Sequence, residues 1–294
     1  MGTHLHRRDL LKLLAVAPAL IPTHVLEQKG GRRFKTSLNA YSFNEPLRAG
    51  TMTLDDLLDY CARQDFDAVD ITGYYFPNYP HVPPDEYLFQ FKRKAHRLGL
   101  SLSGTGIRTD FTQPDAGKRK EDIQLVKNWV HCAAKLGAPV LRIFAGHLNP
   151  PGYSWEQIAT WMVPDLRECV EYGQKHGVIV AVQNHNDFLK TADQVIDLIK
   201  RVDREWLGLV LDVGSYQHGD PYRQIEQTLP YAVNWQVKEL VTVNGKEERL
   251  DLGKLVRILN ASGYRGFLPI ETLGKGDPKE KVARFLDEVR NALG

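Results

Sequence analysis

The feature that most constrains the fold is a regular alternation of two kinds of segment between about residue 34 and the C-terminus. Short runs rich in β-branched and aromatic residues are each followed by a longer stretch with the apolar spacing of an amphipathic helix, and eight such pairs can be counted. The expected strands are 35–43, 68–72, 101–106, 140–145, 178–183, 207–212, 234–238 and 267–271. The expected helices are 54–64, 85–98, 118–136, 155–176, 192–202, 222–229, 252–261 and 278–293.

This alternation favours one fold class. Strands that alternate with helices pair in parallel through right-handed crossovers, and eight such units close into a (β/α)8 barrel. The sequence therefore predicts an α/β fold with a single TIM barrel domain over residues 30–294. An open doubly wound sheet is the alternative, but residues 40–43, after the first strand, read Ala-Tyr-Ser-Phe and not as a glycine-rich phosphate loop.

The first 29 residues have a different character. Arg7 and Arg8 precede an apolar stretch from residue 10 to residue 21 that ends close to small residues and prolines. This pattern resembles a twin-arginine export signal, so residues 1–29 are interpreted as signal and spacer of an exported, periplasmic protein. An amphipathic helix is the alternative. The apolar run is shorter than the roughly 20 residues that a membrane span needs, so no stable membrane insertion is expected after signal removal.

Charge and cysteine content narrow the range of partners. Without residues 1–29 the chain has 34 basic and 34 acidic residues. A groove that neutralises many phosphates would show an excess of lysine and arginine, so nucleic acid is not an expected partner. Cys61, Cys132 and Cys169 lie within expected helices and are interpreted as buried thiols, not as a disulfide framework.

The carboxyl ends of the expected strands, where the active site of such a barrel is built, are unusually polar. Asp212 and Glu271 each end an apolar run. A carboxylate in such a place costs free energy unless it is paired or bound to a metal, so both are predicted to be functional. Asp187, Ser215 and Asp220 are explained equally well as helix caps.

Four short motifs stand at the ends of strands five to eight: Gln183-Asn184-His185, Leu211-Asp212-Val213-Gly214, Gln236-Val237-Lys238-Glu239 and Pro269-Ile270-Glu271. They resemble motifs of the xylose isomerase-like superfamily of TIM barrels, which includes sugar isomerases and epimerases, inosose dehydratases and the endonuclease IV branch. The resemblance covers about residues 34–292. It implies one divalent ion held by Glu on strand five, Asp on strand six, His on strand seven within His-x-Lys-Asp, and Glu on strand eight. Asp212 and Glu271 match this pattern, whereas Gln183 stands in place of Glu and Gln236 in place of His.

The resemblance therefore places a divalent ion at four side chains: Gln183, Asp212, Gln236 and Glu271. Two carboxylates and two amide oxygens suit Mg²⁺, Mn²⁺ or Ca²⁺ better than Zn²⁺, and the affinity should fall because one anionic and one imidazole ligand are missing. His185 or His147 could add a nitrogen ligand. The alternative is a metal-free site in which the two glutamines hydrogen-bond sugar hydroxyls.

The resemblance also constrains the reaction, because epimerases of the superfamily use the glutamates of strands five and eight as two bases. A neutral amide cannot take a proton, so Glu271 is the expected single base, acting on a proton next to a sugar carbonyl. A metal ion or Lys238 would stabilise the enolate, and His185 or His147 would return or deliver a proton. The predicted function is a carbohydrate isomerase or epimerase-type enzyme. A lyase or dehydratase performing β-elimination on a keto sugar or 3-keto-glycoside is the alternative.

The expected ligand is a small carbohydrate, and five side chains are predicted to contact it: Tyr41, Arg108, His147, Asn184 and Tyr216. The long aromatic loop 73–84 is interpreted as a lid or an oligomer contact, and a homodimer is compatible with the resemblance.

Two other functional classes fit less well. A nuclease of the endonuclease IV type needs about three zinc ions with many His, Asp and Glu ligands, and the neutral charge argues against it. A non-catalytic sugar-binding barrel would not require acids and bases at the strand ends, so the combination of Asp212, Glu271, His185 and Lys238 favours chemistry.

Overall fold

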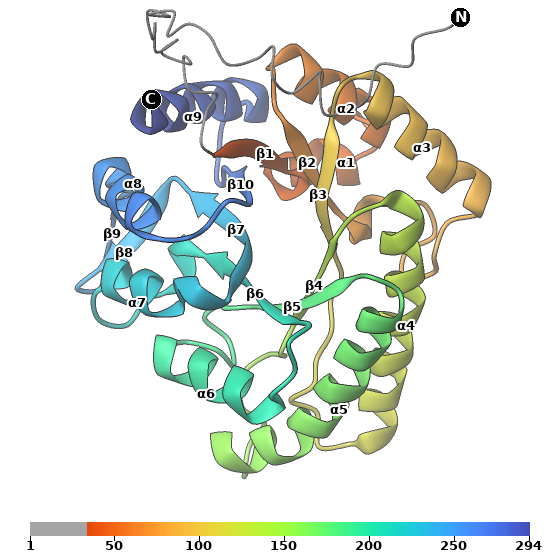
Figure 1. Ribbon diagram of the computed structural model, residues 1–294, viewed down its shortest axis with the longest axis vertical. Helices are drawn as coiled ribbons and strands as arrows, with labels where there is room; N and C mark the ends of the chain where they lie inside the picture. The colour runs from red at the N-terminus through yellow and green to blue at the C-terminus, as the bar shows by residue number, and fades with distance from the viewer. Residues whose placement is uncertain (1–33) are drawn as a thin grey trace, which may run out of the picture. The chain divides into compact units, whose positions relative to one another are not determined.

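A computed structural model describes residues 34–294, which form a closed barrel of eight parallel strands surrounded by helices (Figure 1). Around the barrel the strands follow the order β1, β10, β7, β6, β5, β4, β3, β2, and β2 closes the ring on β1. The predicted (β/α)8 barrel is confirmed. The barrel strands are β1 Lys35–Asn39, β2 Ala68–Thr72, β3 Ser101–Gly106, β4 Val140–Phe144, β5 Ile179–Gln183, β6 Leu207–Asp212, β7 Ala232–Lys238 and β10 Phe267–Glu271.

Helices follow the strands and cover the outside of the barrel (Figure 1). They are α1 Asn44–Arg48, α2 Leu54–Arg63, α3 Asp85–Arg97, α4 Ala116–Leu136, α5 Trp155–Lys175, α6 Ala192–Val202, α7 Pro221–Thr228, α8 Leu252–Ala261 and α9 Pro278–Leu293. Short 3-10 turns are η1 Ala40–Phe43, η2 Gly73–Tyr75, η3 Val213–Ser215 and η4 Leu229–Tyr231. Local sequence fixes several boundaries. Thr53 and Ser154 start α2 and α5 with capping boxes, and Gly137 ends α4 in the left-handed conformation.

The first strand and the connection after β7 differ from the sequence-based expectation, and the short helix α1 was not expected. The first strand ends at Asn39 and not at Phe43, because the Asn39 side chain accepts a hydrogen bond of 2.9 Å from the Tyr41 backbone nitrogen and starts η1. An antiparallel hairpin, β8 Leu240–Val243 and β9 Lys246–Arg249, occupies the connection after β7 where a loop was expected. Its turn is Asn244-Gly245, and both residues have positive φ, as two-residue hairpin turns require.

Three further predictions concern the cysteines, membrane-spanning helices and the export signal. Cys61, Cys132 and Cys169 are buried free thiols, as expected. Within residues 34–294 no helix combines the length and apolar character needed to cross a bilayer. The predicted export signal lies in residues 1–29, outside the described residues, and stays a prediction.

The interior of the barrel contains polar contacts that join strands which are not neighbours. The hydroxyls of Ser37 on β1 and Ser103 on β3 lie 2.7 Å apart, and Asp70 on β2 accepts a hydrogen bond of 2.9 Å from Asn234 on β7. Burial raises the pKa of Asp70 to about 6, although the charge of Arg142 and the Asn234 bond act in the opposite direction. The folded barrel therefore favours the protonated form of this carboxyl group.

This shift makes a prediction about Asp70→Asn. Because the pKa is raised in the folded state, the contribution of Asp70 to stability is complete below about pH 4 and is lost as the pH rises through 6. The free energy of unfolding of the variant relative to wild type should increase by up to about 3 kcal/mol between pH 4 and pH 7. Urea denaturation at four pH values measures it. Asp287→Asn, on the exposed face of α9, controls for loss of a surface carboxylate, and parallel pH profiles for wild type and Asp70→Asn would contradict the assignment.

Candidate active site

A pocket of about 410 Å³ lies at the carboxyl ends of the barrel strands, the place expected for the site. We call it the strand-end pocket. It is lined by Asn39, Tyr41, Tyr74, Arg108, Arg142, Phe144, His147, Gln183, His185, Asp187, Gln236, Lys238, Glu271 and Leu273. Eight of the predicted site residues are in this group: Tyr41, Arg108, His147, Gln183, His185, Gln236, Lys238 and Glu271.

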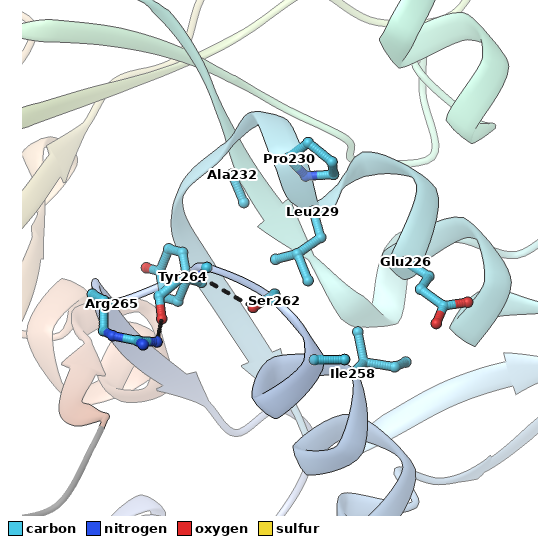
Figure 2. Close-up of a pocket in the computed structure, with 10 residues that line it drawn as sticks. Glu226, Leu229, Pro230, Ala232, Ile258, Ser262, Tyr264 and Arg265 are labelled. Atoms are coloured by element: carbon cyan, nitrogen blue, oxygen red, sulfur yellow. Dashed lines mark hydrogen bonds between the residues drawn. The ribbon is translucent and has the colours of Figure 1, made fainter.

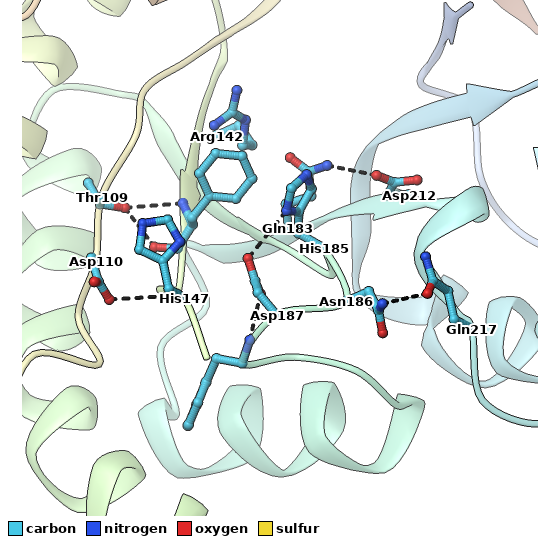
Figure 3. Close-up of polar contacts among 12 residues, drawn as sticks. Thr109, Asp110, Arg142, His147, Gln183, His185, Asn186, Asp187, Asp212 and Gln217 are labelled. Carbon is cyan, nitrogen blue, oxygen red and sulfur yellow. Dashed lines mark hydrogen bonds and ion pairs between the residues drawn. The ribbon is translucent and has the colours of Figure 1, made fainter. Parts of the chain in front are cut away.

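Asp212, at the end of β6, lies beneath the pocket and is fully buried. Its Oδ2 accepts hydrogen bonds from Lys238 Nζ at 2.6 Å and from Gln183 Nε2 at 2.8 Å, and Figure 3 shows the Gln183 contact. Its Oδ1 accepts from the Gly214 backbone nitrogen at 3.1 Å. Three donors, one of them charged, therefore compensate a carboxylate that is removed from water.

Gly214 gives Lys238 the space to reach Asp212. A Cβ atom at position 214 would lie 2.8 Å from Lys238 Cδ and 2.9 Å from the Leu240 carbonyl oxygen, and both distances are too short for carbon. The glycine of the Leu-Asp-Val-Gly motif is thus required by the path of the lysine side chain.

Gln236 lies between the two carboxylates of the site. When its amide nitrogen faces them, Nε2 is 3.2 Å from both Asp212 Oδ2 and Glu271 Oε2, and its oxygen accepts from Asn39 Nδ2 at 2.9 Å. The opposite orientation would set the amide oxygen against two carboxylate oxygens. The orientation that faces the carboxylates places the Gln236 and Gln183 amide nitrogens 2.6 Å apart, whereas the opposite orientation lets the Gln236 oxygen accept a hydrogen bond from Gln183 at that distance. Gln183 Oε1 is buried and has no partner among the described residues, so it can accept a hydrogen bond from a ligand.

Glu271 and Lys238 have shifted proton affinities. Burial raises the pKa of Glu271 and the Asp212 charge adds to this, whereas Lys238, His185 and Arg142 act against it. Burial alone would lower the pKa of Lys238, but the Asp212 and Glu271 carboxylates raise it above the ordinary value. The pocket floor thus presents an ammonium group beside a carboxyl group with increased proton affinity, the pairing that an acid–base reaction needs.

Two predicted substrate contacts are corrected, because both side chains lie in the core and do not line the pocket. Asn184 exchanges two hydrogen bonds with the Asp212 backbone, from its Nδ2 to the carbonyl at 2.8 Å and to its Oδ1 from the amide at 2.9 Å. It therefore holds Asp212 in place. Tyr216 is fully buried, and its hydroxyl donates to Thr228 Oγ1 at 2.9 Å, toward α7.

Histidines and arginines line the upper part of the pocket. His185 Nδ1 is 3.3 Å from Asp187 Oδ2, and the two side chains point toward one another in Figure 3. Arg142 donates to the Ile107 carbonyl at 2.6 Å and to the Tyr74 hydroxyl, while the Arg108 guanidinium lies 4.6 Å from the centre of the Tyr74 ring. These groups can hydrogen-bond hydroxyls and cover an apolar sugar face.

Six pocket residues were not predicted as site residues: Asn39, Tyr74, Arg142, Phe144, Asp187 and Leu273. A signal existed for Arg142, since it interrupts an otherwise apolar strand, as a residue with a functional partner would. Asp187 had been explained as a cap as readily as a functional residue, and its own side chain does accept the Phe188 backbone N–H at 2.7 Å.

The aromatic loop 73–84 is packed onto the barrel. Phe76 is buried against Phe91 and Trp129, and Trp129 Nε1 donates to the Pro80 carbonyl at 2.8 Å. The Tyr79 hydroxyl accepts from the Arg108 backbone nitrogen at 3.0 Å. The loop therefore forms a fixed wall beside the pocket through Tyr74; its predicted roles as a lid or an oligomer contact stay predictions.

A second hollow, of about 600 Å³, lies at the opposite end of the barrel (Figure 2). It is formed at the amino ends of β7 and β10 by residues of η4, α8 and the segment before β10, including Leu229, Ile258 and Tyr264. The Tyr264 hydroxyl donates to the Phe267 carbonyl. Since the amino-terminal face of such barrels serves stability, the strand-end pocket is the candidate active site.

Residues 58–289 match the model of a family described as the xylose isomerase-like TIM barrel. The chain belongs to this family. The predicted resemblance is confirmed, and the strand-end pocket lies at the end of the barrel where TIM barrels build their active sites.

Several relatives of known structure or name are similar to this xylose isomerase-like barrel. D-psicose 3-epimerase from Clostridium cellulolyticum H10 has a TM-score of 0.74 at 17% identity, with 88% of this chain and 99% of that chain covered. The IolI protein, solved with a bound zinc atom, has a TM-score of 0.71 at 17% identity over 88% of this chain and 98% of that chain. The 3'-dehydrocarminate deglycosidase alpha subunit of a Microbacterium species is 26% identical over 113 residues, which are 37% of this chain and 32% of that protein. The matched part thus spans about a third of this curated relative.

The family resemblance implies a divalent ion, so the side chains at the ends of β5, β6, β7 and β10 were compared with the ligands that such an ion needs. Within residues 34–294, no three His, Cys, Asp or Glu side chains come together in a way that could hold a metal ion. Asp212 Oδ2 already carries the Lys238 ammonium, and the amides of Gln183 and Gln236 contact the carboxylates. A divalent ion would have to displace the ammonium and turn the amides, so these residues do not fit the predicted ion.

The corrected position of Tyr216 can be tested with Tyr216→Phe. Loss of its buried hydrogen bond should lower the free energy of unfolding by about 1 kcal/mol, because Thr228 keeps its bond to the Gln224 carbonyl. The dissociation constant of any sugar ligand should stay within about twofold. Tyr74→Phe is the matched variant inside the pocket and should weaken sugar binding. Equal losses of affinity in both variants, measured by calorimetry, would restore Tyr216 as a contact.

Proposed function

We propose that this chain is a carbohydrate-active enzyme that removes a proton next to a sugar carbonyl, with Glu271 as the base. The observation that carries the proposal is the Glu271 carboxyl group on the pocket floor beside the Lys238 ammonium. The likeness to D-psicose 3-epimerase supports a reaction of the isomerase or epimerase type. The predicted ligand, a small carbohydrate, agrees with the size of the pocket.

Each group has a defined part in this reaction. Glu271 takes the proton from the carbon next to the carbonyl, and the electron pair moves to the carbonyl oxygen. Lys238 donates a hydrogen bond to that oxygen and stabilises its negative charge, while Asp212 holds the lysine in place. In an epimerisation His185 then gives a proton to the opposite face of the same carbon. In an isomerisation Glu271 returns its proton to the former carbonyl carbon, and the hydroxyl proton of the neighbouring carbon moves to the former carbonyl oxygen.

Gln183 makes the two faces of the substrate unequal. Its neutral amide cannot act as a base, so a symmetric exchange of protons between two carboxylates is not available in this pocket. The unpartnered Gln183 Oε1 can instead accept a hydrogen bond from a substrate hydroxyl. The proposal is therefore a one-base reaction, in which His185 and not Gln183 supplies any proton that the opposite face needs.

A β-elimination is the second candidate, and the likeness to a deglycosidase subunit favours it. The first step is the same removal of a proton by Glu271. The electron pair of the enolate then expels the oxygen substituent on the adjacent carbon, and His185 protonates the leaving oxygen. His185 is half-exposed and held by Asp187, which suits it to reach a group that leaves toward solvent. On this account the substrate is a keto sugar or a 3-keto-glycoside.

The variant Glu271→Gln tests the base. In D₂O with a panel of free sugars, 3-keto sugars and their glycosides, wild type should incorporate deuterium next to a carbonyl or release an aglycone, as followed by NMR. The variant should lose this activity by about 10³-fold, because removal of a general base costs roughly 10²–10⁴. Its sugar affinity should stay within a few-fold, since the amide keeps the shape of the carboxyl group.

Glu239→Gln is the control for this experiment. Glu239 follows Lys238 but lies outside the strand-end pocket, 3.9 Å from Arg249, Lys281 and Arg284, so its loss should leave exchange unchanged. Full exchange in Glu271→Gln would exclude Glu271 as the base. If wild type binds sugars without exchange or product, the barrel is a sugar-binding protein.

A further inference from the structure

We propose that the site works without a divalent ion and that the Lys238 ammonium is its permanent cation. This deepens the proposed function and rests on it only for the role of Lys238 beside the enolate oxygen. The inference itself concerns which cation occupies the floor of the strand-end pocket, and it can be tested by ion binding alone.

The first argument is charge balance. The family pattern places three carboxylates and one lysine at these strand ends, an excess of two negative charges that one divalent ion neutralises. Here Gln183 replaces one of the carboxylates, so Asp212 and Glu271 face the single charge of Lys238. A divalent ion would change the charge of this buried floor from one excess negative to one excess positive charge, so it would not neutralise the floor as it does in the family pattern.

The second argument is the saturation of Asp212, the carboxylate at the centre of the floor. Its Oδ2 has the Lys238 nitrogen at 2.6 Å and the Gln183 nitrogen at 2.8 Å. Its Oδ1 accepts from the Gly214 backbone. An ion would gain one anionic oxygen only after these donors had been displaced.

The third argument concerns the gap between the two carboxylates. Gln236 Nε2 lies at the same distance, 3.2 Å, from Asp212 Oδ2 and Glu271 Oε2, so one amide group bridges the pair with its two hydrogens. Asn39 holds that amide by donating to its oxygen at 2.9 Å. An imidazole at position 236, as in the family pattern, would ligate an ion there; the amide instead links the carboxylates directly.

The test measures ion binding by the full chain. Protein purified without chelator should contain well under one equivalent of any divalent metal by elemental analysis. Calorimetric titrations with the chloride salts of Mg²⁺, Ca²⁺, Mn²⁺ and Zn²⁺ should show no site of micromolar affinity, and these ions should leave the melting temperature unchanged. One equivalent of any of them bound tightly at this site would overturn the proposal, whatever the enzyme's activity.

Two variants test whether the pocket can be made to bind a divalent ion. The double variant Gln183→Glu/Gln236→His restores the ligands of the family pattern and should bind Mn²⁺ at least about 100-fold more tightly than wild type, the scale of effect that groups around a metal have. Lys238→Met removes the resident cation and should become stabilised by Mg²⁺ or Mn²⁺ through Asp212. Lys246→Met removes an exposed lysine on β9, away from the pocket lining, and should behave as wild type.

The outcomes separate this proposal from the proposed reaction. If both pocket variants fold, as judged by circular dichroism, and neither gains ion binding, the charge-balance argument is wrong and the proposal fails. If the double variant does not fold, Lys238→Met alone decides. Deuterium exchange that persists in wild type after treatment with EDTA supports the proposal, whereas the absence of exchange with every sugar leaves the ion titrations as its test and counts only against the reaction.

Discussion

The candidate site depends on the pairing of Asp212 with Lys238. A fully buried carboxylate is costly unless charge and hydrogen bonds compensate it, and here the Lys238 ammonium, the Gln183 amide and a backbone amide do so. The pairing also fixes Lys238 at the pocket floor. Asn184, which bonds twice to the Asp212 backbone, makes the position of the carboxylate part of the β5–β6 pairing.

The pocket is chemically asymmetric, and this follows from the same pairing. One side of the floor has Glu271, the side chain that can take a proton, and the other has the Gln183 amide, which can only exchange hydrogen bonds. Above them lies a wall of arginine and aromatic groups centred on Tyr74. In the proposed reaction, a substrate bound between these surfaces would meet the Glu271 base on one face only.

Much of the fold could be predicted from the sequence, because each strand and helix carries its own periodic pattern of burial. The pattern also located the strand ends, and with them eight of the pocket residues. The periodic pattern could not show in which direction each side chain after a strand end points. Asn184 comes directly after the end of β5 and Tyr216 four residues after the end of β6, yet both point into the core, since the turn that follows each strand decides which side chain faces the pocket.

The remaining differences have local physical causes. Arg142 sits within a strand, where a sequence pattern assigns only core residues, but its guanidinium extends to the Ile107 carbonyl and the Tyr74 hydroxyl at the pocket. The hairpin β8–β9 follows from Asn244-Gly245, a turn signal that is stronger than the general expectation of a loop after a barrel strand. In both cases the local structure is decided by one residue or one short turn and not by the average hydrophobic pattern of the segment.

Gly214 carries a consequence for the history of this sequence. Any side chain at position 214 would occupy the space through which Lys238 reaches Asp212. Gly214 lies in η3 and Lys238 on β7, 24 residues apart in the sequence. A lineage that keeps the lysine must keep the glycine. A lineage that has lost the lysine still meets a second constraint, because the Leu240 carbonyl oxygen, 2.9 Å from a Cβ atom at position 214, belongs to the backbone.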